Sequence, residues 1–270
     1  LLEPLPQTPF QLPHPAYHLT DEVKSGRAVH TTINDALQKR VNHIVDHRLE
    51  VLHRNHIGNA AVLVVENATG HIRAYVGNGR VTGGDDGTAN NMVTTPRSSG
   101  SILKPFLFAA MLREGMITPR TLIPDIPTQY AGFSPQNFDF AYAGAVPAEE
   151  ALARSLNVPA VRMLKEYGVG AFRKELNTIG FTTINRPAED YGLSLILGGA
   201  EVTLIDLAQA YWRLALSAMP DKLERAPAHL SYEKTDDVLL SPTMDAGVAR
   251  ATLEAMALVT RPDELAGWQA

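Results

Sequence analysis

Ser101 and Lys104 are the two residues whose types and spacing best predict covalent chemistry. On a helix, side chains three positions apart share one face and lie one turn apart. A serine hydroxyl is a weak nucleophile until a nearby base takes its proton, and burial can lower a lysine pKa enough to make that base. Leu103, Pro105 and Phe106 surround Lys104 with apolar groups. The pair therefore predicts an activated serine nucleophile.

The expected helix start supports this interpretation. Pro105 is compatible with a helix only near its beginning, so Ser101 is expected in the N-terminal turn. Free backbone N–H groups and the helix dipole favour developing negative charge there. Gly100 lets the backbone approach a ligand closely.

Spacing alone leaves an alternative open, because a lysine at a helix start can simply extend its amine to solvent. A second match, Ser231 with Lys234, lies in a polar stretch with no helix after it. We interpret this second match as a solvated loop.

Two longer segments resemble catalytic motifs of the transpeptidase domain of class A penicillin-binding proteins. The segment from Arg97 to Phe106 is similar to the first motif of that family. The segment from Glu150 to Ala160, with Ser155 and Asn157, is similar to its Ser-x-Asn motif. The likeness runs from about Thr31 to the C-terminus and includes two further stretches, residues 137–144 and 197–203.

The resemblance implies an α/β (α+β) fold of the penicillin-binding and β-lactamase type, with a helical subdomain and an antiparallel sheet. It places the transpeptidase domain at residues 31–270, after an extended proline-rich linker at residues 1–30. Helices are expected near residues 34–56, 101–111, 147–155, 158–167, 169–177, 202–217 and 242–259. A hairpin is expected from residues 60–65 and 71–76, its first strand covered on both faces.

The resemblance also implies a role for each matched residue. Ser101 would attack the carbonyl of a D-Ala-D-Ala stem peptide and form an acyl-enzyme, and Lys104 would accept its proton. Ser155 would relay a proton to the leaving amine, and Asn157 would bind the substrate amide or hold Lys104. The Ser101 N–H would form half of an oxyanion hole. The product would be cross-linked peptidoglycan, β-lactams would acylate the same serine, and no cofactor or metal is implied.

The third motif of the family, Lys-Thr-Gly on an edge strand, is not matched. Lys234-Thr235-Asp236 is a near miss that we interpret as a loop, because Asp236 would place a negative charge where a substrate carboxylate belongs. The third motif is expected beyond Ala270, so the sheet is expected to be incomplete and this chain catalytically weak. A membrane anchor and a transglycosylase domain, if present, are expected outside this sequence, with the protein on the periplasmic side of the inner membrane.

Composition narrows the remaining possibilities. The net charge of −5 with mixed signs argues against a nucleic-acid partner, and the absence of cysteine excludes thiol catalysis. His43 and His47 have a spacing that can bind zinc, but they lie opposite the apolar stripe and favour a solvated face. The glycines at positions 77, 79, 83 and 84 precede no Gly-Lys-Ser/Thr sequence, which favours a plain loop over a phosphate site.

Two other functions remain open from the sequence. One is an acyl-serine hydrolase, a DD-carboxypeptidase or β-lactamase, which would turn over nitrocefin rapidly. The other is a catalytically weak scaffold for cell-wall partners, which would not acylate at all.

Overall fold

The computed structural model describes residues 30–79, 87, 90–130, 132–219 and 244–259. The chain divides into two compact units, one of residues 1–95 with 229–237 and one of residues 96–228 with 238–270. Each unit is described by itself. Residues 1–29 of the expected linker lie outside the described residues.

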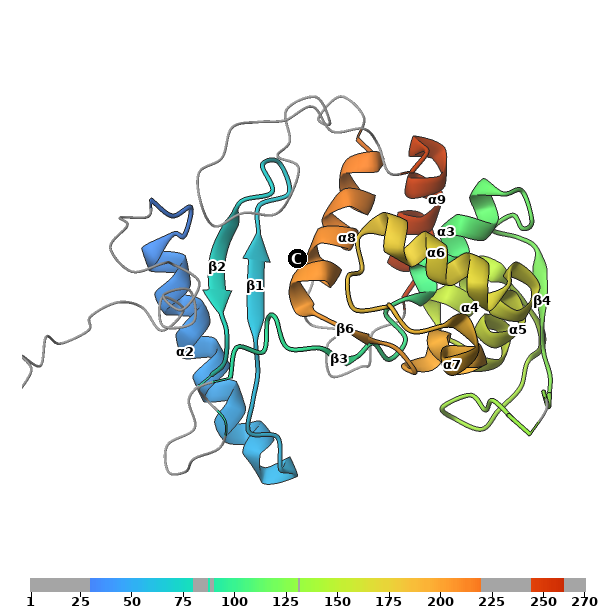
Figure 1. Ribbon diagram of the computed structural model, residues 1–270, viewed down its shortest axis with the longest axis horizontal. Coiled ribbons are helices and arrows are strands. Elements are labelled where there is room, and N and C mark those ends of the chain that lie inside the picture. The colour runs from blue at the N-terminus through green and yellow to red at the C-terminus, as the bar shows by residue number, and fades with distance from the viewer. Residues whose placement is uncertain (1–29, 80–86, 88–89, 131, 220–243, 260–270) are drawn as a thin grey trace, which may run out of the picture. The chain divides into compact units, whose positions relative to one another are not determined.

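The first helix among the described residues of the first unit is the long helix α2 (Asp35–Leu52), which continues into the short 3₁₀ helix η1 (His53–Asn55) (Figure 1). Asn34 starts α2, because its side-chain oxygen accepts the N–H of Leu37 at 2.9 Å. The predicted helix is confirmed, and one of its apolar residues, Ile44, is 55% exposed.

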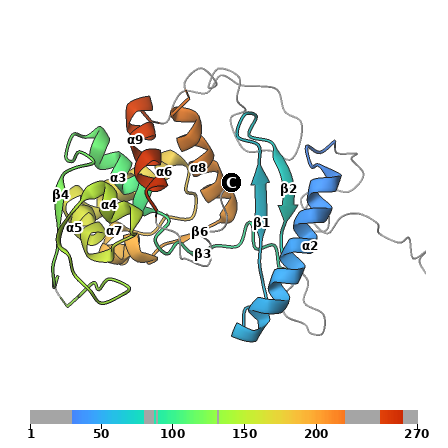
Figure 2. The same ribbon diagram turned by 180° about the vertical axis from the view of Figure 1, so that it is seen from behind.

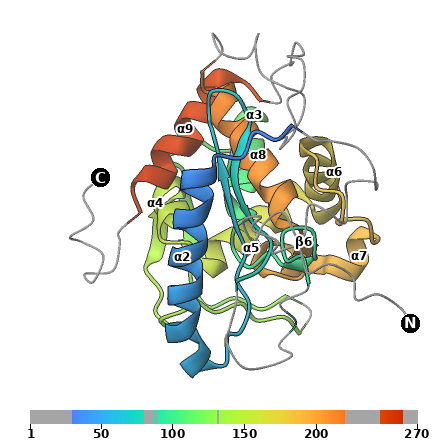
Figure 3. The ribbon, with the colours of Figure 1, turned by 90° about the vertical axis from the view of Figure 1, so that its left-hand side faces the viewer.

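Beside α2 lies the predicted hairpin of β1 (Val62–Val65) and β2 (Ile72–Val76), with Val62 opposite Val76 (Figure 3). Helix α2 packs on β2, whose residues are mostly buried, while every residue of β1 is half-buried. The expectation that the first strand is covered on both faces is therefore wrong. Gln38 of α2 bonds both backbone groups of Tyr75 and so satisfies part of the β2 edge.

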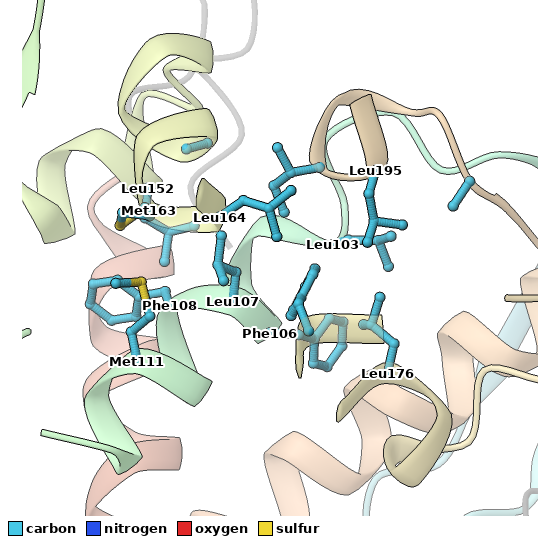
Figure 4. Close-up of a cluster of buried hydrophobic side chains, with 14 of the residues drawn as sticks. Leu103, Phe106, Leu107, Phe108, Met111, Leu152, Met163, Leu164, Leu176 and Leu195 are labelled. Atoms are coloured by element: carbon cyan, nitrogen blue, oxygen red, sulfur yellow. The ribbon is translucent and has the colours of Figure 1, made fainter. Parts of the chain in front are cut away.

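The second unit is built around helix α3 (Lys104–Arg113), in which eight of ten residues are buried. Its Leu107, Phe108 and Met111 side chains meet apolar residues of the neighbouring helices (Figure 4). Those packed against α3 are α4 (Ala148–Ala153), α5 (Asn157–Tyr167), α6 (Val169–Ile179) and α9 (Ala246–Ala257). Burying so much of α3 fixes the direction of the chain just after Ser101.

Helix α8 (Leu204–Ser217) completes this arrangement and packs beside α9 (Figure 2). Thr203 starts α8 by accepting the N–H of Asp206 at 3.1 Å. The predicted helices of this unit are confirmed within a few residues at each end. Two short helices were not predicted, α7 (Ala188–Tyr191) and the 3₁₀ helix η2 (Gly192–Leu197).

Two short antiparallel pairs in the second unit were also missed. Strand β3 (Arg97–Ser98) pairs with β6 (Glu201–Val202), and β4 (Leu122–Asp125) pairs with β5 (Gly144–Pro147). Within the described residues the sheets are three antiparallel pairs, which fits the expected mixed fold with a limited sheet. No helix in the described part of the chain is both long and apolar enough to cross a bilayer.

Candidate active site

Ser101 lies in a tight turn that leads directly into α3. The Ile102 N–H donates to the Ser99 carbonyl at 3.2 Å, and the Lys104 N–H donates to the Ser101 carbonyl at 3.1 Å. Gly100 has φ +52°, a conformation that favours glycine. The helix begins at Lys104, three residues later than predicted, because residues 101–103 form this turn instead. The i to i+3 bond keeps Ser101 and Lys104 one turn apart.

Bonds from distant segments hold both ends of this turn. On one side the Ser99 N–H donates to the Ala200 carbonyl at 2.9 Å, beside the β3–β6 pair. On the other, the Tyr211 hydroxyl donates to the Ile102 carbonyl at 2.7 Å. Burial raises the pKa of Tyr211 to about 12, so its hydroxyl remains a donor at neutral pH.

Lys104 is buried, with 2% of its surface exposed. Its Nζ donates to the Ser155 carbonyl at 2.7 Å, to the Ser155 Oγ at 3.2 Å and to the Asn157 Oδ1 at 2.8 Å. Burial lowers the pKa of Lys104 from 10.5 to about 8. About a tenth of the molecules would then carry a neutral Lys104 amine at pH 7.

Ser155 and Asn157 reach Lys104 because the chain turns sharply between α4 and α5. Ser155 has φ +53°, unusual for a residue with a side chain, and directs both its carbonyl and its hydroxyl at Lys104. Asn157 is the first residue of α5. The Lys104 amine is thus hydrogen-bonded to two of the other three predicted residues, Ser155 and Asn157.

The fourth residue, Ser101, lines a pocket of about 320 Å³ together with Lys104 and Ser155. The other walls are mostly apolar and come from Ile102, Pro105, Leu152, Ala153, Tyr211, Met256 and Val259. Within the described chain, no hydrogen bond joins the Ser101 Oγ to the Lys104 Nζ, and no acceptor bonds the Ser101 backbone N–H. That N–H is available to a ligand.

Three residues near this site were not predicted to have a role in it. Tyr211 lines the pocket, Asn137 contacts the backbone of Asn157, and Asp125 contacts Asn137. Asn137 belongs to a segment that resembles the family, a signal that could have pointed to it. Nothing in the local sequence singles out Asp125 or Tyr211.

None of the other sequence candidates is among the described residues that line this pocket. His43 and His47 are exposed on α2, as predicted, and His47 lies 3.5 Å from Glu50. Among the residues that the structure describes, no three potential ligands gather as a metal site would require. Ser231, the segment from Lys234 to Asp236, and the glycines at positions 83 and 84 lie outside the described residues.

Comparison with known proteins agrees with this fold. The family model described as "Penicillin binding protein transpeptidase domain" matches residues 60–269, and the chain belongs to that family. The predicted resemblance is therefore confirmed. The chain is 34% identical to penicillin-binding protein 1C of Escherichia coli over 96% of its own length and 33% of that protein. It is 34% identical to penicillin-binding protein 1A of Neisseria meningitidis over 56% of its length and 19% of that protein.

Solved structures with similar folds come from the same class of protein. One is the transpeptidase domain of Burkholderia pseudomallei penicillin-binding protein 3, with TM-score 0.68 and 18% identity over 89% of this chain and 72% of that one. Another is the Mycobacterium tuberculosis penicillin-binding protein PonA1, with TM-score 0.66 and 22% identity over 90% of this chain and 67% of that one. The chain spans about a third of the length of the Escherichia coli relative.

Proposed function

We propose that this chain is the acyl-transfer part of a serine-type DD-transpeptidase that cross-links peptidoglycan stem peptides. The observation that carries the proposal is the buried Lys104 amine, bonded to Ser155 and Asn157 in the pocket that Ser101 also lines. Burial favours a neutral amine, which is the form that can accept a proton.

In the first step, the Ser101 Oγ attacks the carbonyl carbon between the two terminal D-alanines, and its proton passes to neutral Lys104. The Ser101 N–H stabilises the negative charge on the carbonyl oxygen. The C–N bond then breaks, the leaving D-alanine amine takes a proton through Ser155, and an ester to Ser101 remains. In the second step, an amine of a neighbouring stem peptide attacks that ester and forms an amide, the C–O bond to Ser101 breaks, and the proton that the amine loses passes through Lys104 to the Ser101 Oγ. A β-lactam opens on Ser101 by the same first step.

We propose further that the protein acts on peptidoglycan stem peptides, is acylated by β-lactams and lies on the periplasmic side of the inner membrane. A Lys-Thr-Gly motif beyond residue 270 would supply the cation for the substrate carboxylate. We call the protein lengthened through that motif the extended chain.

The test is to incubate the extended chain with fluorescent penicillin, nitrocefin and a D-Ala-D-Ala stem peptide with an acceptor amine. The proposal expects slow release of the penicillin label, little nitrocefin turnover, and a cross-linked peptide product. Labelling and cross-linking should both be lost in Ser101→Ala. Rapid nitrocefin turnover would instead identify a hydrolase, and wild-type protein that never acylates would identify a scaffold.

A further inference from the structure

A chain of side-chain hydrogen bonds reaches the candidate site from a buried acid outside it. Asp125 at the end of β4 is 1% exposed, and Asn137 in the following loop is 2% exposed. The Asp125 Oδ1 accepts from the Asn137 Nδ2 at 2.8 Å, and its Oδ2 accepts from the Ala143 N–H at 2.9 Å. Both carboxylate oxygens are thus engaged by neutral donors.

Asn137 also forms hydrogen bonds with the first residues of helix α5. Its Oδ1 accepts the N–H groups of Asn157 and Val158 at 3.0 and 3.2 Å, while its Nδ2 also donates to the Ala141 carbonyl at 2.9 Å. A reversed amide would set its NH₂ against two N–H donors, so only one orientation fits. Since Leu156 makes no side-chain cap for α5, Asn137 supplies one from outside the helix.

The same loop sets the orientation of the Asn157 side chain. The Asn157 Nδ2 donates to the Gln136 carbonyl at 2.9 Å, which leaves its Oδ1 to accept from Lys104. Asn157 is therefore held through both its backbone and its amide. A displacement of this residue would remove an acceptor from Lys104.

We propose that Asp125 and Asn137 are positioning residues that hold Asn157, and through it Lys104, in the geometry needed for acyl transfer. The inference rests on the proposed function, because it assigns these residues to that reaction. A displacement of about 1 Å in such a site can lower the rate by on the order of 10²-fold. Neither residue lines the pocket that contains Ser101, so neither is expected to contact the substrate.

Two isosteric substitutions and their combination test the proposal in the extended chain. In Asp125→Asn, the new NH₂ group must face another donor, either the Ala143 N–H or the Asn137 NH₂. In Asn137→Asp, two carboxylates must face each other. We expect each to lower the second-order rate of penicillin acylation by about ten- to a hundredfold. The double variant restores a donor facing an acceptor, and we expect it to recover most of that loss. Recovery is incomplete because the Ala141 carbonyl loses its donor.

A matched control separates positioning from general destabilisation. Val161 is fully buried on the same helix, one turn from Asn157, and outside the hydrogen-bond chain. Val161→Ala should lower the free energy of unfolding but keep the acylation rate within about twofold of wild type. The proposal fails if either single variant acylates like wild type, if the double variant is no faster than the slower single variant, or if Val161→Ala loses acylation as they do.

A second measurement does not depend on acylation. The Lys104 side-chain carbon shift can be followed by NMR as the 270-residue chain is titrated. Asp125→Asn should displace Asn157, which is one of the acceptors of the Lys104 ammonium, so the Lys104 midpoint should fall, while Val161→Ala leaves it unchanged. An unchanged midpoint in Asp125→Asn overturns the positioning role. Failure of the wild-type extended chain to acylate would overturn the proposed function instead.

Discussion

In the proposed reaction Lys104 must lose its charge, yet three oxygen acceptors surround its Nζ. Burial disfavours the charged form of the amine, whereas the acceptors favour it. The pKa falls to about 8, so the effect of burial is the larger of the two. In that proposal, activation of Ser101 depends on an amine that is neutral in only part of the population at pH 7.

The first prediction concerns the pH dependence of acylation. Below about pH 8 the neutral fraction of Lys104 rises tenfold per pH unit, and above it the fraction levels off. The second-order rate of penicillin acylation should follow this curve between pH 6 and 9. A rate that is flat across this range would contradict a role for Lys104 as the base.

The second prediction concerns stability. The folded-state pKa of Lys104 is about 8 and the unfolded value 10.5, so the unfolded chain binds more protons between these values. The free energy of unfolding therefore gains a contribution from Lys104 as pH rises from about 8 to 10.5, on the order of 3 kcal/mol in full. Lys104→Met lacks it. Between pH 7 and 9.5, urea unfolding should show a larger increase in the free energy of unfolding for wild type than for Lys104→Met. Equal changes would be inconsistent with a depressed pKa.

The third prediction separates the backbone and hydroxyl of Ser155. Ser155→Gly and Ser155→Ala both remove the hydroxyl, so both should slow acylation to a similar degree. Only glycine relieves the left-handed backbone at φ +53°, so it should give a free energy of unfolding about 1 kcal/mol higher than alanine does. Thermal unfolding of the pair checks this, and a more stable alanine variant would argue against strain at Ser155.

At the scale of elements, the two-residue pair β3–β6 holds the turn that carries Ser101. Gly198, at φ +106°, lies against this turn, and its carbonyl accepts from the Ser98 hydroxyl at 2.8 Å. A Cβ at Gly198 would lie 2.7 Å from the Ser98 Oγ and 3.0 Å from the Gly100 nitrogen. The close approach requires glycine.

The fourth prediction follows from this contact. Gly198→Ala should displace Gly100 and Ser101, lower the free energy of unfolding by more than 1 kcal/mol, and slow acylation at least tenfold. Gly170→Ala is the control, because Gly170 lies inside α6 and its added Cβ would meet Ala188 at an ordinary 3.8 Å. It should be neutral or slightly stabilising. Equal acylation by the two variants would show that the contact at Gly198 does not position the nucleophile.

Sequence patterns predicted the long elements well and the short ones poorly. Helices such as α3 and α8 follow from apolar spacing, and the β1–β2 hairpin from a turn between two apolar runs. The pairs β3–β6 and β4–β5 are two to four residues long and pair across distant sequence, so no local pattern marks them. For the same reason the contacts of Asp125 and Tyr211 were not foreseen.

At the scale of the whole molecule, the chain covers about a third of the Escherichia coli relative, and the third family motif is unmatched within it. In the proposed reaction, Ser101 also needs a cation for the substrate carboxylate and a second oxyanion donor, which that motif would supply. The fifth prediction is that the 270-residue chain labels poorly with fluorescent penicillin and the extended chain labels well. Equal labelling would show that residues 1–270 suffice.

The most direct test of the central claim is the intact mass of the extended chain after exposure to benzylpenicillin, followed by peptide mapping. We predict one added penicilloyl group, on the peptide that contains Ser101, and none in Ser101→Ala. An unmodified wild-type protein, or an adduct that persists in the variant, would contradict the account.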